Sequence, residues 1–178
     1  MSLIYITGVE GAGKSVVCKA LKSQGYDALG IDEAGLARRY YKHTWKLTNS
    51  LPAPLESSYE WYNEREWKIK SSDVLRIKQH SGTNPIFLCG ITDNFKEIKD
   101  LVDKTFCLTL PENVVIQRIQ ARKNDTFGKN EAQLEYILKK HRLYEDDNQR
   151  AGSIMVDASM PLARVVDVIL HDAGLTKS

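Results

Sequence analysis

The chain has 178 residues, of which 42% are hydrophobic and 27% are charged, and its formal net charge is +2. This composition is typical of a single globular domain that buries its own core without disulfides. The near-neutral charge provides no broad basic surface for nucleic acid or for an anionic membrane. No apolar run approaches the roughly 20 residues that a membrane-spanning helix needs, and no secretory signal pattern is evident. We therefore expect a cytoplasmic protein without a membrane or nucleic-acid partner.

The cysteines and histidines show no pattern of a disulfide scaffold or a zinc site. Cys18, Cys89 and Cys107 lie in apolar runs at unpaired spacings, which favours free thiols in a reducing compartment. The four histidines have no cysteine or carboxylate companion at ligand spacing. Zinc binding is therefore not expected.

Short apolar runs alternate with longer helical patterns along the chain, which is typical of a parallel α/β sheet. The five predicted strands are Leu3–Thr7, Ala28–Ile31, Ile86–Cys89, Thr105–Leu110 and Ile154–Val156. The predicted helices are Lys14–Ser23, about Glu56–His80, Glu112–Arg122, Glu131–Asn148 and Pro161–Asp172, with weaker patterns at Gly35–Tyr41 and Asn94–Val102. The strands are apolar on both faces, as a sheet covered by helices on two sides requires. The segment Thr44–Leu55, with two prolines, is predicted as a long loop.

Between the first strand and the first helix, the chain reads G-V-E-G-A-G-K-S from Gly8 to Ser15. This stretch matches the Walker A phosphate-loop pattern G-x-x-x-x-G-K-[ST] in full, in the strand–loop–helix context that the pattern requires. Glycines let backbone N–H groups approach phosphate closely, and the start of the helix faces the same anion. Lys14 then reaches the β- and γ-phosphates, and the Ser15 hydroxyl coordinates magnesium.

The phosphate loop therefore predicts that the chain binds ATP with Mg²⁺. The residues expected to hold the nucleotide are Gly8, Gly11, Ala12, Gly13, Lys14, Ser15 and Val16. The pattern identifies the phosphate donor, but it does not identify the reaction.

With this motif and this order of elements, the sequence resembles the small phosphate-loop kinases. These include nucleoside monophosphate kinases, shikimate kinase, gluconate kinase and dephospho-coenzyme A kinase. The resemblance implies one three-layer αβα domain over residues 1–178, with five parallel strands in the order 2-3-1-4-5. It also implies an acceptor-binding insertion at about 38–80, a lid at about 118–142, and transfer of the ATP γ-phosphoryl group to a small molecule.

Asp32 follows the second predicted strand, where the resembling kinases place an acidic residue that faces the acceptor. The resemblance implies that Asp32 orients the acceptor hydroxyl or accepts its proton. Asp is also a favoured N-cap, and a weak helical pattern follows, so a capping role stays open. The run from Asp32 to Gly35 also fits the D-x-x-G pattern of GTPases, but no N-K-x-D guanine motif follows. We therefore reject a GTPase.

Two further sites follow from the same resemblance. Arg118 and Arg122 are four residues apart and share one helix face, where lid arginines of these kinases close over the transferring phosphoryl group. The alternative is a solvated helix face. Ala158 and Met160 follow the fifth strand, where these kinases contact adenine; the alternative is an ordinary turn before a helix that starts with proline.

The acceptor is expected beyond the carboxyl ends of the strands, against Asp32 and Gly90. Trp61 and Arg65 are four residues apart, so a ring and a cation share one side of the predicted helix. The ring is suited to stack on a base, and Arg38 or Arg65 is suited to hold a phosphate or carboxylate. The alternative is that the aromatic residues belong to the core.

The stretch from Cys89 to Asn94 lacks the motifs that adenylate-kinase-like proteins and shikimate kinases carry after the third strand. The sequence thus predicts an ATP-dependent small-molecule kinase with Lys14, Asp32, Arg118 and Arg122 in catalysis, and it favours a nucleotide or nucleoside acceptor. The alternatives are an ATP-binding regulatory protein without a metabolite acceptor and a shikimate- or gluconate-type kinase. The oligomeric state stays open.

Overall fold

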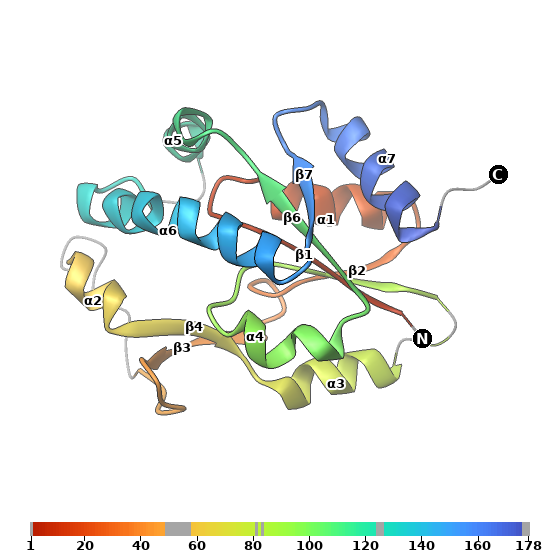
Figure 1. Cartoon of the computed structure of the whole chain (residues 1–178), viewed down its shortest axis with the longest axis horizontal. Helices are drawn as coiled ribbons and strands as arrows, with labels where there is room; N and C mark the ends of the chain where they lie inside the picture. Colours follow the sequence, from red (N-terminus) through yellow and green to blue (C-terminus); the bar gives the residue numbers. More distant parts are fainter. Residues whose placement is uncertain (1, 49–57, 81, 83, 124–126, 176–178) are drawn as a thin grey trace.

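The computed structural model describes residues 2–48, 58–80, 82, 84–123 and 127–175. A five-stranded parallel sheet in the order β2-β5-β1-β6-β7 forms its centre (Figure 1). The strands are β1 Leu3–Gly8, β2 Asp27–Gly30, β5 Ile86–Cys89, β6 Lys104–Thr109 and β7 Ile154–Asp157. Counted within this sheet, the order is 2-3-1-4-5, as predicted; the labels differ because β3 and β4 form a second sheet.

Helices cover both faces of the sheet and complete a three-layer αβα arrangement (Figure 1). They are α1 Lys14–Ser23, α3 Ser71–His80, α4 Phe95–Ile98 with a 3-10 turn Lys99–Leu101, α5 Glu112–Ala121, α6 Glu131–Arg150 and α7 Leu162–Ala173. The predicted helices at the corresponding positions of α1, α4, α5, α6 and α7 are thereby confirmed. Within the described part of the chain, no helix has the length and apolar composition needed to cross a bilayer.

Alternate side chains of β1 face two separate cores. Ile4 and Ile6 pack in the cluster that includes α1 and α7, whereas Leu3 and Tyr5 pack in the cluster that includes α3 and α4. Successive strand residues point to opposite faces of a sheet, and all four side chains are buried. Burial on both faces explains why the strand is a continuous apolar run.

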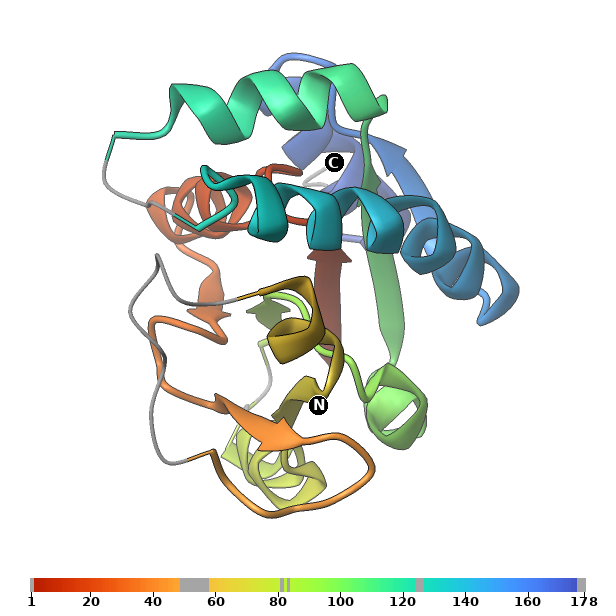
Figure 2. The ribbon, with the colours of Figure 1, turned by 90° about the vertical axis from the view of Figure 1, so that its left-hand side faces the viewer.

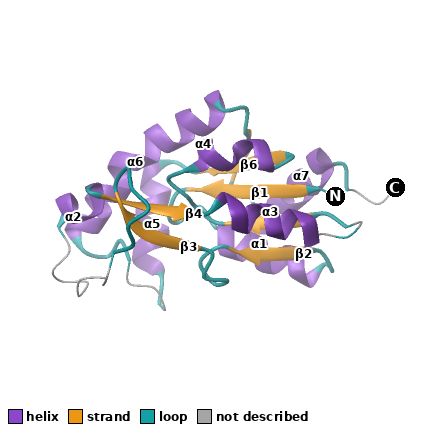
Figure 3. Cartoon of the chain, turned by 90° about the horizontal axis from the view of Figure 1, so that it is seen from below, coloured by secondary structure: helices purple, strands orange, loops and turns teal. Residues whose placement is uncertain are grey.

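The region between β2 and β5 differs from its prediction. The weak helix predicted at Gly35–Tyr41 is wrong, because Ala37–Tyr41 forms strand β3. The long helix predicted at about Glu56–His80 is also wrong. Its described part divides into α2 Tyr59–Asn63, β4 Arg65–Ile69 and the helix α3. Strands β3 and β4 pair antiparallel and lie beyond the carboxyl end of β1 (Figure 3).

Long-range hydrogen bonds favour a strand at β4. The Trp67 N–H donates to Asp93 Oδ2 at 2.7 Å, and the Asp93 N–H donates to the Trp67 carbonyl at 2.8 Å. Asn94 bonds both main-chain groups of Ile69, at 3.2 and 2.9 Å. The apolar spacing of this segment fits a helix or a strand equally well. The hydrogen-bond partners that favour the strand are Asp93 and Asn94, which follow helix α3 and strand β5 in the sequence.

Two predicted loops lie partly outside the described residues. The loop Thr44–Leu55 is described to Thr48, and within it Leu47 pairs with Tyr40 in an isolated bridge. The loop between α5 and α6 is described except for residues 124–126. The described N-terminal part of α6 packs beside α2 (Figure 2).

Gly90 follows β5 and passes very close to Ile31. A Cβ at Gly90 would lie 2.6 Å from the Ile31 Cβ, and Ile31 is fully buried. We therefore expect Gly90→Ala to lower the free energy of unfolding by about 1–3 kcal/mol through overpacking. Thermal unfolding measures this loss, and Gly82→Ala is the matched control because a Cβ there meets nothing within 4 Å. Equal melting temperatures for the two variants would contradict the expectation.

Candidate active site

The phosphate loop joins β1 to α1 through backbone conformations that favour glycine. Gly8, Gly11 and Gly13 have φ values of 146°, 87° and 101°. A Cβ at Gly8 would lie 2.6 Å from the Leu108 carbonyl oxygen of the neighbouring strand β6. No side chain caps α1 at Gly13. The N–H groups of Val16 and Val17 donate to the Gly13 carbonyl, at 3.1 and 3.0 Å, and those of Lys14 and Ser15 at the start of the helix are placed to meet an anion.

Lys14 lies over the loop and bonds its backbone. Its Nζ donates to the carbonyl oxygens of Gly8 at 2.7 Å and Val9 at 2.8 Å. Burial lowers the pKa of Lys14, while the charges of Glu10 and Asp32 act to raise it. A phosphate oxygen is a stronger partner for an ammonium group than a neutral carbonyl. The loop therefore holds its cation in place for a polyanion.

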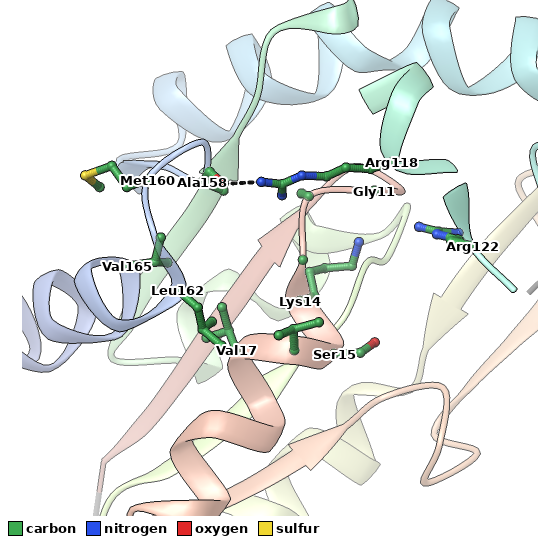
Figure 4. Close-up of a pocket in the computed structure, with 13 residues that line it drawn as sticks. Gly11, Lys14, Ser15, Val17, Arg118, Arg122, Ala158, Met160, Leu162 and Val165 are labelled. Carbon is green, nitrogen blue, oxygen red and sulfur yellow. Dashed lines mark hydrogen bonds between the residues drawn. The ribbon is translucent and has the colours of Figure 1, made fainter. Parts of the chain in front are cut away.

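A pocket of about 510 Å³ opens over the loop (Figure 4). This volume lies within the roughly 300–1,000 Å³ that small-molecule and cofactor sites occupy. Its lining combines backbone, cationic and apolar residues: Gly11, Ala12, Gly13, Lys14, Ser15, Val16, Val17, Arg118, Arg122, Ala158, Met160, Leu162 and Val165. The structure thus brings together the predicted loop, the two predicted lid arginines and the predicted adenine loop.

Arg118 connects two walls of this pocket. It extends from α5, and its Nη2 donates to the Ala158 carbonyl at 2.8 Å (Figure 4). The loop that carries Ala158 is shaped by Asp157, whose Oδ1 accepts from the Ser159 N–H at 2.8 Å and the Ser159 hydroxyl at 2.6 Å. These bonds lower the pKa of the Asp157 carboxyl. Arg122 lines the same pocket. The helix α5 ends at Ala121 and Arg122 has an extended backbone, so the predicted common helix face with Arg118 is not formed.

Asp32 lies in a turn and does not cap a helix. The Gly35 N–H donates to the Asp32 carbonyl at 3.0 Å, and the next element is strand β3. The capping alternative is therefore wrong. The exposed Asp32 carboxylate accepts a hydrogen bond from the Trp67 indole Nε1 at 3.0 Å. The charge of Asp32 acts to raise the pKa of Lys14 in the phosphate loop.

The predicted acceptor residues are only partly brought together. Arg65 lies against Trp61, with Cζ 4.3 Å from the ring centroid and Nη1 donating to the Trp61 carbonyl at 2.8 Å. Arg38 is exposed, and its Nη1 lies 3.4 Å from the place of a Cβ on Gly35. Gly90 donates its N–H to the Ile6 carbonyl at 3.0 Å, which ties it to the sheet.

Sequence reasoning did not single out five residues of these sites. Val17, Leu162 and Val165 form an apolar wall of the pocket over the phosphate loop. The last two belong to α7, which was predicted as a helix but was given no part in the site. Arg39 and Trp67 lie in the predicted acceptor-binding region, where the Arg39 Cζ is 5.5 Å from the Trp67 ring centroid. The helical assignment of the segment concealed both, because only the β3–β4 pairing places them opposite each other.

The fold and the phosphate loop define an α/β protein of the phosphate-loop class. The sequence matches the AAA domain family over residues 4–138, and the chain belongs to that family. A comparison with curated proteins finds no match.

Solved structures of small kinases share the fold over almost the whole chain. A gluconokinase from Sinorhizobium meliloti 1021 is 19% identical, with a TM-score of 0.55 and coverage of 98% of this chain and 91% of that one. A shikimate kinase from Bacteroides thetaiotaomicron is 14% identical, with a TM-score of 0.57 and coverage of 98% and 99%. A deoxyadenosine kinase from M. mycoides is 16% identical, with a TM-score of 0.51 and coverage of 98% and 100%. These likenesses confirm the predicted fold.

Proposed function

We propose that this chain is a small-molecule kinase that transfers the γ-phosphoryl group of ATP to an acceptor. One observation carries the proposal: a complete phosphate loop shares its pocket with Arg118 of α5 and with Arg122, which follows that helix. The charge of Asp32, which follows β2 two strands away from β1, acts on Lys14 of the loop. The fold shared with a gluconokinase, a shikimate kinase and a deoxyadenosine kinase supports it.

The residues of the loop fit ATP and Mg²⁺. The uncapped start of α1 and the positive-φ glycines form a cradle of N–H groups for phosphate. Lys14 would neutralise the β- and γ-phosphates, and the Ser15 hydroxyl would be the magnesium ligand from the protein. Bound magnesium supplies charge neutralisation at the transferring phosphate. Ala158 and Met160 would contact the adenine.

On the acceptor side, Asp32 would orient the hydroxyl that attacks the γ-phosphorus. The hydroxyl oxygen forms the new P–O bond, the bond to the bridging oxygen of ADP breaks, and Asp32 takes up the hydroxyl proton. Arg118 and Arg122 would stabilise the charge that spreads over the transferring oxygens. The indole of Trp67 holds the Asp32 carboxylate in place.

The chain would act as one kinase domain with an acceptor-binding insertion at about 38–80 and a lid at about 118–142. Contacts around Tyr62 of α2 join these two segments. Its ring centroid lies 5.5 Å from Phe127 and 5.2 Å from Tyr136, and its hydroxyl accepts from Gln133 Nε2 at 2.9 Å. Binding of an acceptor to the insertion would therefore affect the position of the lid through these contacts.

The test is ADP release from ATP and magnesium across a panel of nucleosides, nucleotides, shikimate, gluconate and dephospho-coenzyme A. We expect strong stimulation by one class of compound. ATP binding without stimulation by any compound would favour the alternative of a regulatory ATP-binding protein. Binding of a fluorescent ATP analogue, measured in parallel, separates that result from an inactive preparation.

A further inference from the structure

One face of the β3–β4 hairpin carries two arginines among aromatic rings. The register places Arg39 opposite Trp67 and Tyr41 opposite Arg65. Cross-strand partners share a face, and alternate residues along each strand do so as well. These four side chains therefore lie on the same side of the hairpin, and Trp67 reaches Asp32 from that side.

Aromatic rings surround both guanidinium groups. The Arg39 Cζ lies 5.6, 5.2 and 5.5 Å from the ring centroids of Trp61, Tyr62 and Trp67. The Arg65 Cζ lies 4.3 Å from the centroid of Trp61 and 5.0 Å from that of Tyr41. Together these residues form a cage of rings around two cations, which we call the arginine cage: Arg39, Tyr41, Trp61, Tyr62, Arg65 and Trp67.

The guanidinium groups of the arginine cage have only part of their hydrogen bonds satisfied among the described residues. Nε and Nη1 of Arg39 and Nε of Arg65 are enclosed without a hydrogen-bond partner there. Arg65 forms an ion pair with the exposed Glu64 at 3.4 Å, and its Nη1 donates to the Trp61 carbonyl at 2.8 Å. Enclosed donors without acceptors destabilise the fold, most strongly when they carry charge. The cation–π contacts compensate for part of this loss, because rings attract the charge but accept N–H groups weakly.

Nearby carboxylates are already bonded to other groups. Asp93 is paired with Lys140 and accepts the Trp67 N–H, and Glu66 lies 3.5 Å from Lys68. A cavity of about 220 Å³ borders the arginine cage and includes Tyr62 and Arg65 in its lining. The cage thus combines excess positive charge, free donors and adjacent space on the acceptor side of Asp32.

We propose that the arginine cage binds an anionic group of the acceptor, a phosphate monoester or a carboxylate, so that a neutral nucleoside or sugar is not the substrate. The inference rests on the proposed function, because it assigns the acceptor of the same site. A planar guanidinium donates two parallel hydrogen bonds to either anion. The anion would fix the acceptor, and its hydroxyl would then reach toward Asp32.

The first test compares charged and neutral probes by the fluorescence of the cage tryptophans. The pairs are AMP with adenosine, D-gluconate with D-glucose and shikimate with methyl shikimate, each added after the phosphate loop is saturated with magnesium and a non-hydrolysable ATP analogue. We expect the charged member of at least one pair to bind about tenfold or more tightly than its neutral partner. The pair that responds distinguishes a phosphate from a carboxylate ligand.

The second test measures whether binding of the charged probe depends on the arginine cage, by replacing Arg39. Arg39→Met keeps the aliphatic stem but removes the donors, so the affinity for the charged probe should fall by about tenfold or more. Arg39→Lys should retain part of the affinity through its charge. Arg76→Met is the matched control, because Arg76 is exposed on α3 and paired with Asp73. Equal binding of charged and neutral probes, no binding of any charged probe, or unchanged affinity in Arg39→Met would overturn the proposal.

The stability of Arg39→Met separates a ligand-binding arginine from a structural one. Removing enclosed, unpartnered donors should leave the melting temperature unchanged or raise it. If Arg39 were retained for its contacts with the rings, the same variant would melt lower by more than about 4 °C, and that result would argue against the proposal.

ADP release distinguishes the failure of this inference from the failure of the kinase proposal. Arg39-dependent binding of a charged probe without ADP release in any reaction would support the cage and contradict the kinase. Equal stimulation by charged and neutral probes, unchanged in Arg39→Met, would support the kinase and overturn the cage.

Discussion

Replacing Lys14 by methionine should reduce acceptor-stimulated ADP release by about a hundred- to a thousandfold, the loss that follows removal of one preorganised transition-state donor. Lys14 is held over the loop by the Gly8 and Val9 carbonyls, so its charge is in position before the nucleotide arrives. Methionine retains the aliphatic stem but removes the charge. Affinity for a fluorescent ATP analogue should fall as well, because the triphosphate loses its principal side-chain cation.

Lys19→Met is the matched control for this experiment. Lys19 lies on the same helix α1 but is exposed and outside the pocket lining. Its replacement should leave ADP release and ATP affinity unchanged. If Lys14→Met retained the wild-type rate, the phosphate loop could not be the donor site, and the proposed function would fail with it.

Replacing Asp32 by asparagine should lower the rate of transfer by about a hundred- to ten-thousandfold, the range that a positioned general base contributes. Asparagine has the same shape, and its Oδ1 can still accept the bond that the Trp67 indole donates to Asp32. The variant therefore removes the charge and the proton-accepting capacity without removing the local contact. ATP affinity should change little, because Asp32 lies outside the lining of the nucleotide pocket.

Glu33→Gln controls for a general loss of negative charge near the turn. Glu33 is exposed and lies beside Gly30, so its replacement should leave the rate unchanged. A wild-type rate in Asp32→Asn would remove Asp32 from the mechanism but would leave ATP binding by the loop intact. Loss of ATP affinity in that variant would instead show that Asp32 serves the nucleotide.

The nucleotide half of the site could be predicted from sequence because its determinants are local. The phosphate loop is eight consecutive residues, and backbone curvature, helix start and lysine all follow from their order. Apolar runs at β1, β5 and β6 identified strands buried on both faces. Resemblance to small phosphate-loop kinases supplied the strand order and placed Arg118, Arg122, Ala158 and Met160, and the pocket includes all four.

The acceptor half depended on contacts that the local pattern does not contain. Trp61, Trp67 and Ile69 fit a helical spacing, yet only Trp61 lies in a helix. Trp67 and Ile69 belong to strand β4, whose main chain is bonded by the side chains of Thr92, Asp93 and Asn94. A change from a period of 3.6 to a period of 2 alters which side chains share a face. In the β3–β4 hairpin, Arg38 and Arg39 therefore point to opposite faces. The Trp67 indole lies within hydrogen-bond distance of the Asp32 carboxylate.

The sequence by itself therefore specified the fold class and the phosphate loop, since short-range patterns identify such a loop and buried parallel strands. Its resemblance to small phosphate-loop kinases supplied the strand order. Only the tertiary structure decided which side chains of the β3–β4 hairpin lie on the proposed acceptor side. The hairpin β3–β4 is held by pairing between its two strands and by hydrogen bonds to the loop after β5. Such bonds join residues distant in sequence, and their free energy can override the weak local preference of a short segment.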